Sequence, residues 1–347
     1  MKSVVNKRTD LCARVLGLAL FATVAAAPAA QATPIVIVPD AGLAANTAAL
    51  AAFNRAATTL GSLFSDPITV NINANLASLA PGIIGSTSAT LLVGGYTLVR
   101  NQMVADAANE ADDAIVAALP TAAQFLAQVP AGFTLDGRVI LSQANAKALG
   151  FGGFALPDAT ITFSSNFAFD YDNSDGVGAG LIDFETVALH ELVHVLGFIS
   201  WVDFIDGSSP TATYFTTLDM FRFAANNAPT NAAQFTNNPR NFVPGAAAVT
   251  SDVANNWAMS TGLGVGGDGR QASHWKDDSL TGSHIGIMDP TLSSGLVFGL
   301  TDADIRALDL IGWDQAAPVP EPASILLLGS GLVAVIRNRK RRGQTIQ

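Results

Sequence analysis

The chain carries His190-Glu191-Leu192-Val193-His194-Val195-Leu196-Gly197-Phe198, and this stretch decides the local fold around it. On an α-helix, residues four apart lie one above the other, so His190 and His194 can direct two imidazoles at one metal ion. Glu191 follows one step round the helix, where its carboxylate can reach a water beside that metal and act as a general base. The stretch therefore predicts a metal-binding helix whose catalytic residue is Glu191.

The flanking residues also favour a helix. The lead-in, Asp183-Phe184-Glu185-Thr186-Val187-Ala188-Leu189, has an acidic first turn and apolar residues at helical spacing. Gly197 offers a stop at the other end. An H-E-x-x-H pattern on a helix is typical of zinc metalloproteases, so we predict one catalytic Zn²⁺ as the cofactor.

A third ligand is expected, because catalytic zinc usually has three protein ligands and one open position. Downstream of Glu191 the only glutamate is Glu321, near the C-terminal end. Ser200 stands where a close-spaced histidine pattern would place its third histidine. The remaining candidates are two histidines and two carboxylates: His274, His284, Asp203 and Asp206.

Two further segments distinguish among these candidates, Ala272-Ser273-His274-Trp275 and Gly286-Ile287-Met288-Asp289-Pro290. With the H-E-x-x-H-x-x-G-F stretch they resemble the leishmanolysin-type metzincins, in which a long insertion precedes the third histidine and a methionine turn follows it. Residues 300–313 also resemble the closing helix of that family. The resemblance is strong over 183–314 and vague over 33–182. It implies the following roles: His190, His194 and His274 as zinc ligands, Glu191 as the catalytic residue, and Met288 as the structural methionine turn.

This resemblance implies a fold and an activity. The fold would be a metzincin-like zincin catalytic domain, and the activity that of a secreted zinc-dependent endopeptidase acting on polypeptide substrates. The chain lacks the cysteines of the eukaryotic members and has a different insertion, so substrate preference does not transfer. Two alternatives are a catalytically inactive zincin-fold surface or matrix protein and a zinc hydrolase of a non-peptide bond. The intact Glu191 speaks against the first.

Charge is distributed unevenly along the chain. The formal net charge is −10, but basic residues concentrate at the two ends, and residues 33–316 hold nine basic and 26 acidic side chains, a net of −17. Such a segment is a poor partner for nucleic acid or anionic membrane surfaces. The only cysteine, Cys12, lies in a segment expected to be removed, which excludes cysteine zinc ligands and a cysteine nucleophile.

The N-terminal end has the features of a targeting signal. Residues 1–32 combine a basic start, an apolar run over 15–27 and an Ala30-Gln31-Ala32 cleavage site. This predicts a signal peptide that signal peptidase removes before Thr33. A membrane anchor is the alternative, although the apolar run is shorter than the ~20 residues of a typical span.

The C-terminal end, residues 317–347, has three parts. Pro318-Val319-Pro320-Glu321-Pro322 precedes a short apolar run over 323–336 and then the cluster Arg337-Asn338-Arg339-Lys340-Arg341-Arg342, which would stay on the cytoplasmic side. This arrangement resembles the PEP-CTERM sorting tail of Gram-negative bacteria. It implies transient anchoring by a short transmembrane segment, processing by an exosortase, and delivery to the cell envelope or extracellular matrix. A plain membrane anchor is the alternative.

The segments around the active-site helix predict an α+β fold with a mixed sheet. We expect one domain over 33–316, with an N-terminal subdomain over 33–199 and a loop-rich C-terminal subdomain over 200–316. Strands are expected over 34–38, 68–73, 159–163 and 167–171, helices over 44–64, 105–119, 122–128 and 144–150, and loops over most of 225–270. An edge strand near 163–167 would hold an extended substrate by strand addition.

A calcium site is a weaker expectation. The run Asp170-Tyr171-Asp172-Asn173-Ser174-Asp175-Gly176 crowds carboxylates among turn residues. Its glycine falls one place late for an EF-hand loop, and Leu181 stands where that loop needs a glutamate. A solvated acidic turn is therefore favoured over Ca²⁺.

Overall fold

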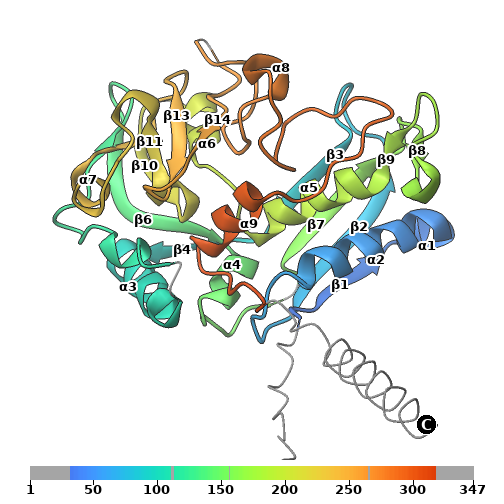
Figure 1. The fold of residues 1–347 in the computed structure, drawn as a ribbon, viewed down its shortest axis with the longest axis horizontal. Helices are drawn as coiled ribbons and strands as arrows, with labels where there is room; N and C mark the ends of the chain where they lie inside the picture. The colour runs from blue at the N-terminus through green and yellow to red at the C-terminus, as the bar shows by residue number, and fades with distance from the viewer. Residues whose placement is uncertain (1–31, 111–112, 156, 265, 318–347) are drawn as a thin grey trace, which may run out of the picture.

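The computed structural model describes residues 32–110, 113–155, 157–264 and 266–317 (Figure 1). The C-terminal apolar run over 323–336 lies outside these residues, as does all but the last residue of the expected signal peptide. Within the described residues, no helix is long and apolar enough to cross a membrane.

A four-stranded mixed sheet in the order β1-β2-β7-β3 supports the active-site helix. The strands β1 (Ile35–Pro39), β2 (Val70–Ala77) and β7 (Ala159–Ser164) are parallel, whereas β3 (Gly85–Ala89) pairs antiparallel with β7 at the end of the sheet. Alternate residues of β2 and β7 are buried, as expected where one face of a sheet packs on the core.

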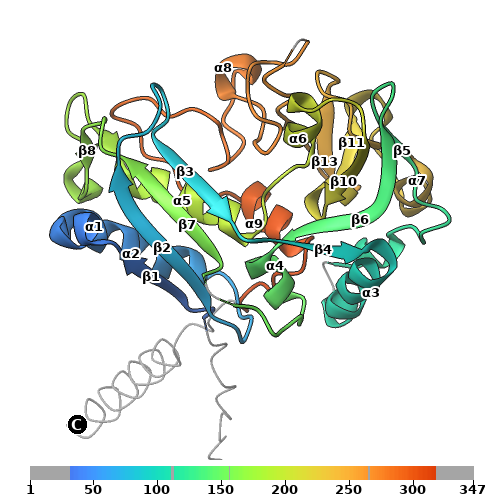
Figure 2. The ribbon, with the colours of Figure 1, turned by 180° about the vertical axis from the view of Figure 1, so that it is seen from behind.

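Two helices lie side by side on one face of this sheet, and Figure 2 shows the opposite face without a covering helix. They are α2 (Thr47–Gly61) and α5 (Phe184–Leu196). The ring of Phe163 on β7 lies 4.9 Å from that of Phe53 on α2 and 4.4 Å from that of Phe184 on α5. These buried aromatic contacts fix α5 against the sheet.

Two further sheets have three and five strands. One has the order β10 (Ala212–Thr216), β6 (Thr134–Ser142), β4 (Leu91–Gly95), and the other has the order β14 (Asn256–Met259), β13 (Ala248–Ser251), β11 (Arg222–Ala224), β12 (Arg240–Asn241), β5 (Ala127–Gln128). Both contain strands from either side of residue 200, and the subdomain boundary expected there stays a prediction. The short strands β8 (Phe169–Asp170) and β9 (Ile182–Asp183) pair with each other just before α5.

The remaining helices are short. The α-helices are α1 (Ala41–Ala45), α3 (Tyr96–Asp106), α4 (Gln143–Ala148), α6 (Val202–Gly207), α7 (Ala232–Asn237), α8 (Asp278–Thr281) and α9 (Asp302–Asp309). Single 3₁₀ turns occupy Ala107–Asn109, Val116–Ala118, Asn173–Asp175, Leu218–Phe221 and Ala225–Asn227.

The fold class is α+β, as predicted, and most of the strands predicted before α5 are present. The helix expected over 44–64 is divided at Asn46, whose side chain accepts from Ala49 N and caps α2. The prediction of a helix over 105–119 is wrong after Asp106, where α3 ends. Among the described residues up to 119, only 3₁₀ turns follow it, at Ala107–Asn109 and Val116–Ala118, and Asp113 between them pairs with Arg306 of α9.

Two other expectations are corrected. Residues 122–128 are not helical, because their last two residues form β5 and pair in parallel with β12. The 225–270 segment is irregular over more than half of its described residues, as expected, and it also supplies β12, β13 and β14 to one sheet. The edge strand next to β7 is β3 and not the region near 163–167, because β7 has β2 on one side and β3 on the other.

Candidate metal centre

The active-site helix α5 has a cap at each end. Asp183 precedes it, and its carboxylate accepts from the backbone N–H of Thr186 at 2.9 Å. Gly197 ends it with φ of 118°, a left-handed conformation that favours glycine. The helix therefore begins and ends where the sequence predicts, and it carries His190 and His194 one turn apart.

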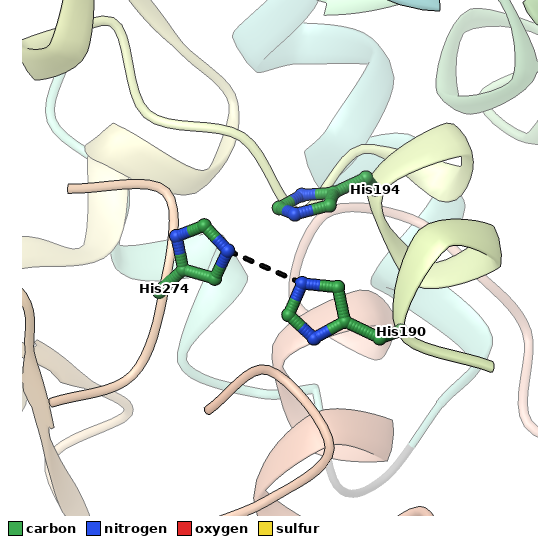
Figure 3. A group of neighbouring side chains, drawn as sticks. All are labelled: His190, His194 and His274. Carbon is green, nitrogen blue, oxygen red and sulfur yellow. Dashed lines mark hydrogen bonds between the residues drawn. The ribbon is translucent and has the colours of Figure 1, made fainter. Parts of the chain in front are cut away.

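Three histidines converge on one point (Figure 3). His190 and His194 project from α5, and His274 faces them from a loop on the opposite side. The Nε2 atoms of His190 and His274 are 3.2 Å apart. The three ring centroids lie between 4.9 and 5.1 Å from one another. The structure thus brings together the three residues that the family resemblance selects.

A backbone carbonyl contacts Nδ1 of each imidazole, on the side away from the other two rings, and orients the ring. Nδ1 of His190 contacts the Ile287 oxygen at 2.8 Å, and Nδ1 of His194 contacts the Phe198 oxygen at 2.8 Å. Nδ1 of His274 contacts the Gln271 oxygen at 3.2 Å. A carbonyl can only accept, so each Nδ1 carries the proton and each Nε2 presents a lone pair. Such carbonyl contacts are typical around metal-bound histidines.

The electrostatics favour neutral rings. Burial lowers the pKa of His190, and burial with repulsion from His190 lowers the pKa of His194 to about 3. Burial and the two neighbouring rings bring the pKa of His274 well below its ordinary value. Neutral imidazole is the form that binds metals.

The donor set fits zinc. Two neutral Nε2 atoms that face each other at 3.2 Å have no proton to share. Two nitrogens bonded to one tetrahedral zinc at about 2.0–2.1 Å would lie about 3.3 Å apart. This spacing and these tautomers are compatible with a three-histidine zinc site.

Glu191 is buried beside this group and held from the adjoining sheet. Its Oε2 lies 2.7 Å from the hydroxyl of Thr87 on β3. A side-chain carbon at Gly85 would come within 2.5 Å of Oε1, so only glycine leaves room for this carboxylate. Burial raises the pKa of Glu191 to about 7, against a smaller lowering by the Thr87 hydrogen bond. A carboxylate in this state can both accept and return a proton near neutral pH.

The loop that carries His274 is fastened on both sides. The carboxylate of Asp203 accepts from the backbone N–H groups of Ala272 and Ser273. On the other side, the N–H of Trp275 donates to the carbonyl of Met288 at 3.0 Å. The segment around Met288 therefore lies directly beside the third histidine, and the Met288 side chain is fully buried.

The other candidate ligands have different surroundings. His284 is outside the three-histidine group but lines the same cleft. Asp203 holds the His274 loop, and Asp206 accepts from the N–H of Gly264 at 2.7 Å. Ser200 donates to Asp219 at 2.6 Å.

The carboxylates of the acidic turn over 170–176 accept hydrogen bonds from nearby backbone N–H groups. Asp170 accepts from the N–H groups of Asp172 and Gly178, and Asp172 accepts from that of Ser174. Within the described residues these carboxylates join no group of three metal-binding side chains. Whether this turn binds calcium stays a prediction.

A cleft of about 780 Å³ runs past the three histidines and Glu191. One wall is the segment 82–89, which includes β3, and another contains Trp201, Phe204 and Leu263. Sequence reasoning missed Gly85 and Thr87. The stretch Gly85-Ser86-Thr87-Ser88-Ala89 has none of the apolar alternation that signals a half-buried strand.

Comparison with known proteins identifies the C-terminal tail. The model of the PEP-CTERM protein-sorting motif matches residues 318–342. No curated protein and no solved structure gives a significant match to the chain. The motif marks the protein for processing by an exosortase and for export to the cell envelope or extracellular surface.

Proposed function

We propose that this protein is an exported zinc endopeptidase of the metzincin type. The observation that carries the proposal is the convergence of three neutral histidine Nε2 atoms next to a buried glutamate in one cleft. A purely structural zinc site is closed by its protein ligands and has no use for a buried carboxylate at its side. The placement of Glu191 therefore favours catalysis over an inactive binding role.

The metal and Glu191 would contribute different steps to peptide hydrolysis. His190, His194 and His274 would hold the zinc, which when bound supplies a Lewis acid that polarises a carbonyl and acidifies a water. Glu191 would take a proton from the attacking water and return it to the leaving nitrogen. Thr87 and Gly85 keep the carboxylate in place, one by a hydrogen bond and the other by leaving room.

A polypeptide fits the cleft better than a compact ester or amide. Among the described residues, no strand pairs with β3 on the side away from β7, and β3 lines the cleft. An extended peptide can add to such an edge through backbone hydrogen bonds. These would place consecutive peptide groups along the wall from which Thr87 reaches Glu191. The second alternative, hydrolysis of a non-peptide bond, has no comparable support.

The expected location of the protein is consistent with an endopeptidase activity. The sorting motif takes the protein to the envelope or surface. We propose that its substrates are polypeptides of the envelope or extracellular matrix of a Gram-negative cell.

Hydrolysis of labelled casein by the purified protein tests the proposal. We expect cleavage that a chelator abolishes and added Zn²⁺ restores, with new N-termini that show cleavage within the casein chain. Chelator-resistant cleavage would contradict a zinc mechanism. Failure to cleave casein or a peptide library by protein that has bound zinc would contradict an endopeptidase.

A further inference from the structure

A second group of metal-binding side chains lies at the rim of the same cleft. Asp278, His284 and Asp289 each offer a ligand atom, and these atoms lie within 4.8 Å of one another. Asp278 begins α8, whereas His284 and Asp289 belong to the loop that also carries Met288. This group has no residue in common with the three-histidine group.

In the part of the chain that the structure describes, the ring nitrogens of His284 lack the hydrogen-bond partners that buried nitrogens usually have. Among the described residues, neither of its ring nitrogens has a hydrogen-bond partner, and both atoms are buried. In the neutral ring one nitrogen carries a proton and the other a lone pair, so each of them needs a partner. Leaving a buried polar group unpaired is unfavourable, because the group has lost its hydrogen bonds to water. A cation that binds one nitrogen would remove much of this cost.

The ring is held in place rather than free to turn away. It stacks on Phe298 with centroids 3.9 Å apart and planes 12° from parallel. Phe298 is fixed in turn, because its backbone N–H donates to the hydroxyl of Thr186 on α5 at 3.0 Å. The orientation of His284 is thus set by contacts that involve neither of its nitrogens.

The spacing suits an ion better than a hydrogen bond. Nδ1 of His284 and Oδ2 of Asp289 are 3.9 Å apart. Hydrogen bonds between nitrogen and oxygen extend to about 3.2 Å. Two ligands bonded at about 2.1 Å to one tetrahedral zinc lie about 3.4 Å apart, so a bound ion would draw these two atoms together by about 0.5 Å. Both nitrogens are buried and lack a hydrogen-bond partner among the described residues, so a cation would give the ring a partner that the protein does not.

The ligand types indicate the class of cation. Imidazole is a ligand for zinc, copper, iron and nickel, whereas calcium and magnesium prefer sites made of oxygen alone. One imidazole and two carboxylates make a mixed nitrogen and oxygen set. We propose that Asp278, His284 and Asp289 form a second site, separate from the three histidines, for a divalent transition-metal cation such as Zn²⁺. The proposal does not depend on the peptidase activity.

The second site would stabilise the loop beside the first. Asp289 follows Met288 and Ile287, and the Ile287 carbonyl orients His190. Asp289 also accepts from the N–H of Asp278 at 2.8 Å. A cation between these residues would fasten the start of α8 to the segment behind His190.

Zinc stoichiometry of the purified protein tests the site, by calorimetric titration with ZnCl₂ alone and metal analysis after gel filtration. We expect two equivalents for the wild type, one for His284→Gln, one for His274→Gln and none for the double variant. Asp302→Asn, an exposed acid at the start of α9, serves as the control and should keep two. Equal zinc binding by the wild type and His284→Gln would overturn the proposal.

Thermal unfolding in the His274→Gln background gives an independent readout. Zinc should raise the melting temperature there by mass action, and the rise should vanish when Asp289→Asn is added. If His284→Gln does not fold, Asp278→Asn replaces it, because Asp278 is partly exposed. An equal rise with CaCl₂ alone would overturn the assignment to a transition metal. Loss of hydrolysis with both zinc sites intact would count against the peptidase proposal alone.

Discussion

The hydroxyl of Thr87 lies 2.7 Å from Oε2 of Glu191, and 2.9 Å from the backbone oxygen of the same residue. These two residues are 104 positions apart in the chain. The contact joins the edge strand β3 to the active-site helix at the residue proposed as general base. It therefore links the wall proposed to hold substrate with the group proposed to move the proton.

Replacing Thr87 with valine should lower kcat while leaving zinc binding unchanged. Valine keeps the shape but removes the hydroxyl that orients the carboxylate. We expect a loss of roughly tenfold, which corresponds to about 1.4 kcal/mol in activation free energy. Thr87→Ser restores the hydroxyl and should recover most of the rate. Equal kcat for the wild type and the valine variant would show that the hydrogen bond has no role in turnover.

Gly85→Ala should reduce activity through a steric effect. The added carbon would meet Oε1 of Glu191 at 2.5 Å and displace the carboxylate. Ser86→Ala on the same strand is the control, since Ser86 is exposed. Steady-state hydrolysis of a peptide substrate measures the effect, with kcat expected to fall for Gly85→Ala only. A Gly85→Ala variant with the kinetics of the control would contradict the close packing.

Asp203→Asn should weaken zinc binding although Asp203 is not a proposed ligand. Its carboxylate accepts from the backbone N–H groups just before His274, and the amide replaces one acceptor oxygen with a donor. Residues that orient metal ligands typically change metal affinity by about 10- to 100-fold. Competition with a chelating dye measures the affinity. An unchanged zinc affinity would show that the His274 loop is held without Asp203.

Stability should fall as pH rises through the neutral range. Burial, with repulsion from Asp314, raises the pKa of Asp66 from 3.8 to about 8. Between these two values the folded protein keeps a proton that the unfolded chain has lost, so the free energy of unfolding decreases with increasing pH. Burial and Asp314 likewise raise the pKa of Glu110 to about 9.

Melting temperatures measured from pH 7 to pH 9 check this dependence, because below pH 7 the buried histidines, whose pKa values are lowered, act in the opposite direction. Asp66→Asn should flatten the decline, because the amide does not titrate. Asp136→Asn should not, since Asp136 lies on the surface beside Arg138 and its pKa is lowered. A wild-type melting temperature that increases over this range would contradict the argument.

The local part of the site was predictable from sequence, and the nonlocal part was not. His190, Glu191 and His194 follow from the geometry of one helix, whose caps at Asp183 and Gly197 are also local signals. His274 needed a family pattern, because no spacing rule brings position 274 to position 190. The carbonyl of Ile287 carries no sequence signal at all, since every residue has one.

The fold shows the same division. Strands β1, β2 and β7 are apolar enough to be recognised, but β3 is polar and exists because it pairs with β7. The Ala-rich segment after Asp106 has high helix propensity, yet its acidic residues and its contacts with the C-terminal end prevail over that propensity. In particular, Arg306 of α9 pairs with Asp113, a contact between residues almost 200 positions apart.

The most direct test of the central claim is a comparison of the wild type and Glu191→Ala at equal zinc content, with casein hydrolysis measured at the same protein concentration. The account predicts the same bound zinc in both proteins and a loss of hydrolysis of at least about 100-fold in the variant, because the general base is removed while the three histidines remain. Undiminished hydrolysis by the zinc-loaded variant would contradict it.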